Sequence, residues 1–161
     1  MGEDVVFQFA AYALARKTVV MPDKFYHYVM ESESATHEFN SAEARAKKLD
    51  AHMRMLEEVL EDWAAYGLLG LCPGELITWF LDLIVFDLAR LDADDFHRVA
   101  ARVNMDLTTF LGTEWADMPA KGGVRRVAHK LVAATSDVSM ADATLFYLST
   151  RGLKACLERF I

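Results

Sequence analysis

Two carboxylates lie inside one of the most apolar stretches of the chain, ELITWFLDLIVFDLAR, residues 75 to 90. A carboxylate in apolar surroundings can act as a general acid or base, because burial raises its pKa. On a helical wheel Asp82 lies on a narrow polar stripe, whereas Asp87 lies within the apolar arc. Burying a lone carboxylate is costly, so we expect Asp87 to be protonated or paired, with Arg90 or with an arginine of another helix. A structural ion pair is our prediction; an exposed position at a partner interface and an acid–base role stay as alternatives.

The histidines raise the question of a metal site. There are five: His27, His37, His52, His97 and His129. Bundles that bind two iron ions carry Glu-x-x-His on each of two helices, and the nearest approach here is the single Asp94-x-x-His97. No HExxH, GxSxG, GxGxxG or GxxxxGK[ST] pattern occurs, and neither cysteine has a histidine beside it. We therefore predict no metal, no cofactor and no enzymatic activity.

The apolar stretch could in principle cross a membrane, but its length and charge oppose this. A spanning helix needs about 20 apolar residues, and Asp82 and Asp87 would each add to the cost of insertion. We predict instead a buried core helix over 75–91. The N-terminal apolar stretch is followed by Arg16 and Lys17, which is the reverse of the charge order in a secretory signal. A cytoplasmic protein is therefore expected.

Composition indicates one globular domain over residues 1–161. The chain is 53% hydrophobic and 25% charged, and it has only three prolines. A chain of this length can bury a core that needs no disulfide or metal. We expect Cys72 and Cys156 to be reduced thiols, with a single bridge between them as the alternative.

The apolar residues follow helical periodicity almost throughout, so we predict an all-α fold. The expected architecture is a single compact bundle of six to eight helices around the buried helix 75–91. The expected helices cover residues 4–16, 22–30, 41–66, 75–91, 94–103, 107–115, 124–135 and 139–160, and 18–21 could form a short strand. The polar stretch 31–40 is expected to be a surface loop, in which Asn40 caps the next helix together with Glu43. Ser139 is expected to cap the last helix.

Helix 41–66 has the clearest pattern. Its small and apolar residues follow four–three spacing along one seam: Ala42, Ala46, Leu49, Met53, Leu56, Leu60, Trp63 and Gly67. A break rich in Gly and Pro separates this helix from 75–91, so the two should pack as an antiparallel pair. Homodimerisation through the 42–63 seam is the alternative to burying it inside the chain.

Charge is distributed unevenly. The net charge is −7, with −5 over residues 31–62, −6 over 63–120 and +4 over 121–161. Arg126, His129 and Lys130 share one face of the helix 124–135. This face either is solvated and partly neutralises the acidic middle of the chain, or is a docking patch for an acidic partner.

The segment DDFHRVAARVNMDLTTFLG, residues 94 to 112, resembles the helix-turn-helix of small repressors. Its apolar residues fall where that family places them, and Asn104 stands where the tight turn usually has glycine. Asparagine tolerates the left-handed conformation, so the substitution is mild. The resemblance implies a recognition helix over 107–111.

The same resemblance implies contacts with DNA, in which Thr108 and Thr109 face the bases and Arg98 and Arg102 lie near phosphates. Negative charge around that face opposes phosphate contact. The acidic residues concerned are Asp92, Asp94, Asp95, Asp106, Glu114 and Asp117. A helix-turn-helix DNA-binding regulator is therefore the alternative function.

Our main prediction is a non-enzymatic protein-binding or regulatory module of the inhibitor, adaptor or immunity type. It would act through an acidic helical surface, supported by the acidity of 31–120 and the length of helix 41–66. An acidic body repels phosphate backbones, which argues against a nucleic-acid partner, and we expect no membrane partner. The partner is another protein, and a homodimer stays open. The candidate contact residues are Asp87, Arg126, His129 and Lys130.

Overall fold

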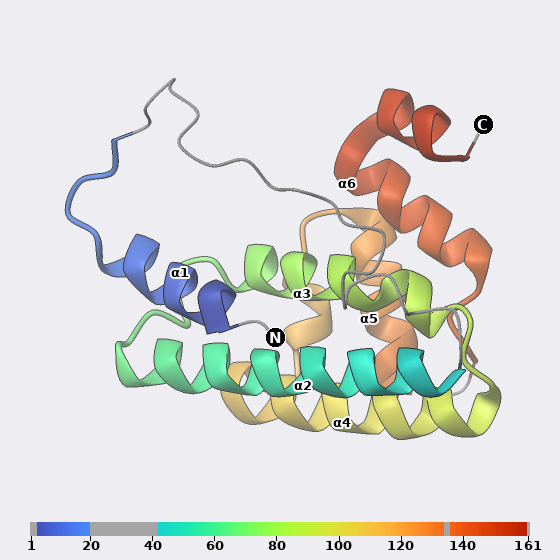
Figure 1. Ribbon diagram of the computed structural model, residues 1–161, viewed down its shortest axis with the longest axis horizontal. Coiled ribbons are helices and arrows are strands. Elements are labelled where there is room, and N and C mark those ends of the chain that lie inside the picture. Colours follow the sequence, from blue (N-terminus) through green and yellow to red (C-terminus); the bar gives the residue numbers. More distant parts are fainter. Residues whose placement is uncertain (1–2, 20–41, 134–135, 161) are drawn as a thin grey trace.

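The computed structural model describes residues 3–19, 42–133 and 136–160. These residues form six α-helices and one short 3-10 turn, with no strand among them, which confirms the all-α prediction. The elements are α1 (Glu3–Leu14), α2 (Ala42–Ala65), α3 (Pro73–Leu88), α4 (Ala93–Leu111), η1 (Trp115–Asp117), α5 (Gly122–Ala133) and α6 (Met140–Phe160) (Figure 1). The predicted helix 22–30, the loop 31–40 and the Asn40 cap lie outside the described residues. Of the strand considered at 18–21, residues 18 and 19 have no regular structure and the rest is outside them too.

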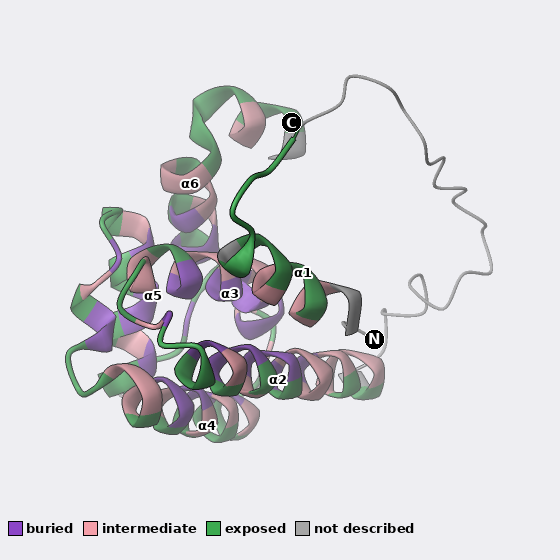
Figure 2. Cartoon of the chain, turned by 90° about the vertical axis from the view of Figure 1, so that its left-hand side faces the viewer, coloured by how far each residue is buried: buried purple, intermediate pink, exposed green. Residues whose placement is uncertain are grey.

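Helix α3 is the predicted core helix. It begins at Pro73, whose missing N–H costs nothing at a helix start, and it buries Phe80 and Ile84 of the apolar arc completely. The narrow polar stripe predicted on this helix is confirmed as well: Glu75 is exposed, and Thr78 and Asp82 are half-buried. Figure 2 shows buried residues on the facing sides of α2, α3 and α5, so the core lies between these helices. No helix within the described ranges is both long and apolar enough to cross a bilayer.

Helices α2 and α3 pack as the predicted antiparallel pair (Figure 1). α2 ends before Gly67, whose φ of 69° turns the chain back. The seam of α2 is buried inside the chain, from Leu49 to Trp63. The chain's own α3 and α4 cover this part of the seam, as the first of the two alternatives predicted, and homodimerisation stays a prediction.

The prediction of two helices over 94–103 and 107–115 is wrong, because α4 is one continuous helix. It begins at the N-cap Asp92, whose carboxylate accepts a hydrogen bond from the N–H of Asp95 at 2.9 Å, and it ends at Gly112. Asn104 does not make a turn. Its Oδ1 accepts hydrogen bonds from the Trp115 indole at 3.0 Å and from the Thr108 hydroxyl at 3.2 Å. These contacts tie the middle of α4 to the next segment and keep Asn104 helical.

The last two helices pack closely and are joined by a capped turn. The predicted cap at Ser139 is confirmed: its hydroxyl accepts from the N–H of Asp142 at 3.2 Å, and the Asp142 carboxylate accepts from the N–H of Ser139 at 2.9 Å. This reciprocal pair is a capping box with aspartate as its second residue. α6 bends at Gly152, where φ is 84°, and its last turns leave the line of the helix (Figure 1).

Candidate functional site

Asp87 is buried, with 7% of its surface exposed, and its carboxylate lies 2.8 Å from Nζ of Lys48 on α2. The predicted structural ion pair is confirmed. Its partner is a lysine, however, and the expectation of Arg90 or another arginine is wrong. Arg90 is exposed at the end of α3. The pair ties α3 to α2, and a contact between Asp87 and a partner protein stays a prediction.

Asp82 ties the same helix to α6, because its carboxylate lies 2.6 Å from the guanidinium of Arg151. This pair lies at the edge of an open hollow of about 330 Å³ that the polar stripe of α3 shares with Lys121 and Thr150. Both aspartates of the opening stretch are thus used to hold neighbouring helices.

The basic face predicted on α5, made by Arg126, His129 and Lys130, meets acidic partners of the same chain. Arg126 Nε and Lys130 Nζ lie 2.6 and 2.8 Å from the Asp142 carboxylate, and His129 Nε2 lies 3.0 Å from Asp117. Burial raises the pKa of the Asp142 carboxyl, but hydrogen bonds from Lys130, Ser139 and Arg126 outweigh it and hold this pKa well below its usual range. Of the two interpretations of this face, neutralisation of acidic residues within the fold agrees with these ion pairs.

The residues of the DNA-binding alternative are also engaged inside the chain. Arg102 bonds Glu57 and Asp50 of α2, both at 2.8 Å, and Arg98 bonds Asp95 at 2.7 Å. The Thr109 hydroxyl donates to the Met105 carbonyl at 2.8 Å, and Thr108 bonds Asn104. α4 is a single helix, so the helix-turn-helix predicted here is not formed, and both arginines face carboxylates of the same chain.

Asp106 lies in the same α2–α4 contact and is buried, with one carboxyl oxygen that has no hydrogen-bond partner among the described residues. Burial, followed by the nearby Glu57, raises the pKa of Asp106, and Arg102 opposes this shift. The folded chain therefore holds the Asp106 proton more strongly than the unfolded chain does. This carboxyl stabilises the fold fully at acidic pH, and its contribution falls as the pH rises through the raised pKa.

Asp106→Asn is expected to stabilise the chain at pH 7, because the amide is neutral at every pH and can donate to Glu57. We expect a gain of about 0.5–1 kcal/mol in the free energy of unfolding. Urea denaturation at pH 7 and again near pH 4 measures it. The gain should shrink at the lower pH, because a carboxyl with a raised pKa takes up its proton more readily as the pH falls. A variant less stable than the native chain at both pH values would contradict this account.

An apolar hollow of about 340 Å³ opens where α1 meets the end of α2. Its lining residues are Phe9, Tyr12, Trp63, Leu71 and Cys72. Phe9 anchors α1 there. The centroid of its ring lies 4.3 Å from that of Trp79 and 5.8 Å from that of Trp63. Tyr12 and Leu71 are 67% and 69% exposed, so large apolar side chains at this hollow face solvent.

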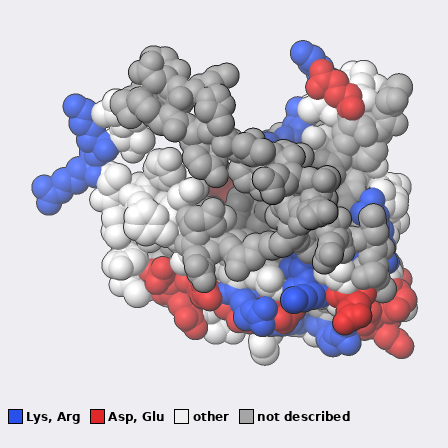
Figure 3. Space-filling view, viewed as in Figure 1, with Lys and Arg blue, Asp and Glu red and all other residues white. Residues whose placement is uncertain are grey.

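An acidic stripe lies on the last turns of α2, the helix whose Trp63 lines this hollow. Glu58, Glu61 and Asp62 share one helix face, and Asp62 lies one turn before the exposed Tyr66. The three carboxylates form no ion pair with any described residue. Figure 3 shows acidic side chains along the edge of α2, next to an uncharged area over α1. We call the hollow and this stripe together the docking face.

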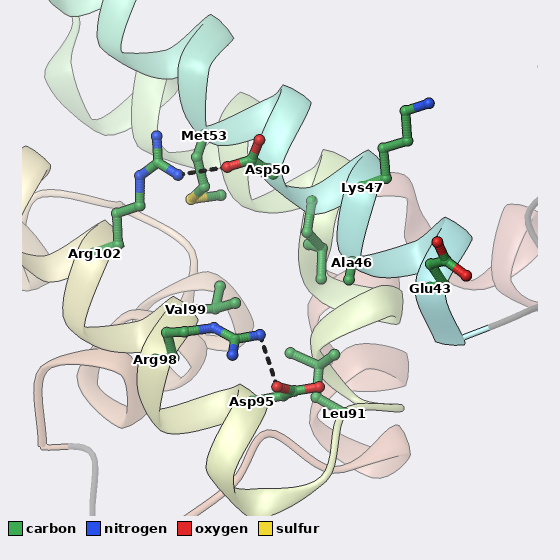
Figure 4. Close-up of a pocket in the computed structure, with 11 residues that line it drawn as sticks. Glu43, Ala46, Lys47, Asp50, Met53, Leu91, Asp95, Arg98, Val99 and Arg102 are labelled. Atoms are coloured by element: carbon green, nitrogen blue, oxygen red, sulfur yellow. Dashed lines mark hydrogen bonds and ion pairs between the residues drawn. The ribbon is translucent and has the colours of Figure 1, made fainter.

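A second groove, of about 530 Å³, lies between the first halves of α2 and α4 (Figure 4). Its floor is apolar, with Ala46, Met53 and Val99 among its residues, and the Arg102–Asp50 ion pair crosses one end. Charged side chains of both signs form its rims. Asp87 lines none of these three hollows, so the structure adds nothing to its candidacy as an acid or base.

The sequence reasoning missed Tyr12 and Leu71. A signal was present in the first helix, whose apolar residues go all round the helix, more than one buried face needs. Both cysteines are free thiols, and within the described ranges no three His, Cys, Asp or Glu side chains are placed to share a metal ion.

Comparison with known proteins assigns the chain to no family. The chain matches no protein-family model, no curated protein and no solved structure.

Proposed function

We propose that this chain is a protein-binding module of regulatory type, and that its docking face receives a basic segment carrying at least one large apolar side chain. The observation that carries the proposal is the apolar hollow at α1 beside an acidic stripe that has no ion-pairing partner in the described parts of the chain. The partner's apolar side chain fills the hollow, and its cations meet Glu58, Glu61 and Asp62.

The physical argument comes from what folding alone would select. Exposed Tyr12 and Leu71 leave apolar surface in water, and such contiguous surface is typical of interaction sites. Like charges three and four residues apart destabilise a helix by a few tenths of a kcal/mol. Neither feature helps the fold, and both are complementary to a basic amphipathic segment.

The test is affinity capture from a lysate of the organism that encodes the chain, with quantitative mass spectrometry. Leu71→Lys places a charge in the hollow, and Glu61→Lys reverses the middle of the stripe. We expect the protein retained by the native chain to be reduced about tenfold or more by either change, since one lost contact of about 1.4 kcal/mol corresponds to tenfold.

Leu153→Lys is the matched control, because Leu153 is 64% exposed, like Leu71, but lies on α6. It should retain the same partner as the native chain, and circular dichroism checks that every variant is folded. If the retained proteins are the same for all four baits, or if nothing is retained above bare resin, the proposal is wrong.

A further inference from the structure

The outward side of α2 carries a stripe of alternating charge near its N-terminal end. We define the outer stripe as Glu43, Lys47, Asp50 and Arg54, whose spacing of four, three and four places them on one helix face. Glu43 and Lys47 are exposed, and the side chains of Asp50 and Arg54 are 45% and 60% exposed. The stripe borders the α2–α4 groove, so it lies on a different part of α2 from the docking face.

Only half of the outer stripe is satisfied by the described residues of the chain. Asp50 bonds Arg54 at 2.7 Å and Arg102 at 2.8 Å. Glu43 and Lys47 have the spacing of a helical ion pair, yet they pair neither with each other nor with another described residue. Figure 4 shows their side chains pointing apart and away from the groove floor.

The order of charges along the stripe is negative, positive, negative, positive, which changes sign at every position when the helix is turned end for end. An antiparallel copy of α2 therefore presents Arg54 to Glu43 and Asp50 to Lys47. A two-fold axis between the helices repeats both pairs, which is the symmetry of an isologous dimer. We propose that the outer stripe joins two copies of this chain in an antiparallel, two-fold symmetric dimer. This inference goes beyond the proposed function and does not depend on it.

The chemistry of the contact sets its strength. Exposed ion pairs each contribute little to the stability of a dimer. A contact along about three helical turns also buries less surface than the roughly 1,200 Å² of a stable interface. The aliphatic stem of Lys47, which lines the groove together with Ala46 and Val99, adds some apolar contact to these ion pairs. The dimer is therefore weak, forms at high protein concentration, and is dissociated by salt.

The test is sedimentation velocity of the native chain over about a hundredfold range of concentration, at low and high salt. Glu43→Arg places like charges opposite each other twice in the dimer, and Arg54→Glu does the same. We expect each single variant to weaken the association by about tenfold or more. The double variant, Glu43→Arg with Arg54→Glu, restores opposite charges and should dimerise like the native chain.

An equimolar mixture of the two single variants gives a second readout. In the mixed dimer the arginine introduced by Glu43→Arg in one copy faces the glutamate introduced by Arg54→Glu in the other. The unchanged Arg54 of the first copy faces the unchanged Glu43 of the second, so both contacts join opposite charges. The mixture should therefore associate, although neither variant does so alone.

Glu114→Arg, a charge reversal at an exposed site outside α2, is the control and should have no effect on association. A chain that is monomeric at every concentration would overturn the proposal. A dimer indifferent to either single change, or a double variant as weak as the singles, would overturn it as well.

Discussion

Replacing Asp142 with alanine is expected to lower the free energy of unfolding by about 3 kcal/mol at pH 7. The Asp142 side chain is only 2% exposed and accepts hydrogen bonds from Arg126, Lys130 and both the N–H and hydroxyl of Ser139. Alanine would leave two cations without their carboxylate and remove half of the capping box of α6. Urea denaturation at pH 7 measures the loss.

The same residue predicts a pH dependence. Because the folded-state pKa of Asp142 lies below its unfolded value, this carboxylate stabilises the fold at neutral pH, and its contribution is lost as the pH falls through the acidic range. The difference between the native chain and Asp142→Ala should therefore shrink towards acid. Asp137→Ala is the control, since Asp137 is exposed and Lys130 contacts only its backbone carbonyl. Equal losses from the two substitutions would show that the Asp142 cluster does not hold α5 to α6.

Gly123→Ala is expected to cost about 2–3 kcal/mol, although alanine normally favours a helix. A Cβ at position 123 would stand 2.5 Å from the backbone oxygen of Leu145 and 2.5 Å from the Ser149 hydroxyl. The hydroxyl can rotate away, but the carbonyl belongs to α6 and cannot. The two helices would have to separate, which loses the packing between them. Thermal and urea denaturation measure the cost.

The neighbouring glycine is the control for this prediction. A Cβ on Gly122 would meet nothing within 4 Å, so Gly122→Ala keeps the gain in helix propensity without a clash. We expect it to leave stability unchanged or raise it by up to about 1 kcal/mol. Of two substitutions one position apart, only Gly123→Ala should thus lower the free energy of unfolding. If Gly123→Ala were as well tolerated as Gly122→Ala, that result would contradict a close approach of α5 and α6 at Gly123.

Predictions from apolar periodicity succeeded where one helix buries one face. The four–three spacing of α2 and the apolar arc of α3 are local properties that any packing of these helices has to satisfy. The error at α4 arose because the apolar spacing of a helix-turn-helix is also that of a continuous amphipathic helix. What distinguishes them is a contact made across eleven residues, from the Trp115 indole to Asn104.

For the charged residues, the predicted kind of interaction was confirmed, but the predicted partner was wrong. That a buried Asp87 needs a cation or a proton follows from its place in the apolar arc. Which cation it meets depends on how α2 lies against α3, and the answer is Lys48, 39 residues earlier. The basic face of α5 shows the same dependence, because nothing local indicates that Asp142 would neutralise two of its side chains.

The sequence by itself determined that the described chain is helical, that the helix predicted over 75–91, found as α3, is the core helix, and that Ser139 caps the last helix. These follow from periodicity and capping, which act over a few residues. Only the tertiary structure decided which charges are neutralised and which stay open, and therefore which surfaces could bind. A charge is neutralised by whichever helix packs beside it, and that neighbour is brought close by burying apolar surface, not by its position in the chain.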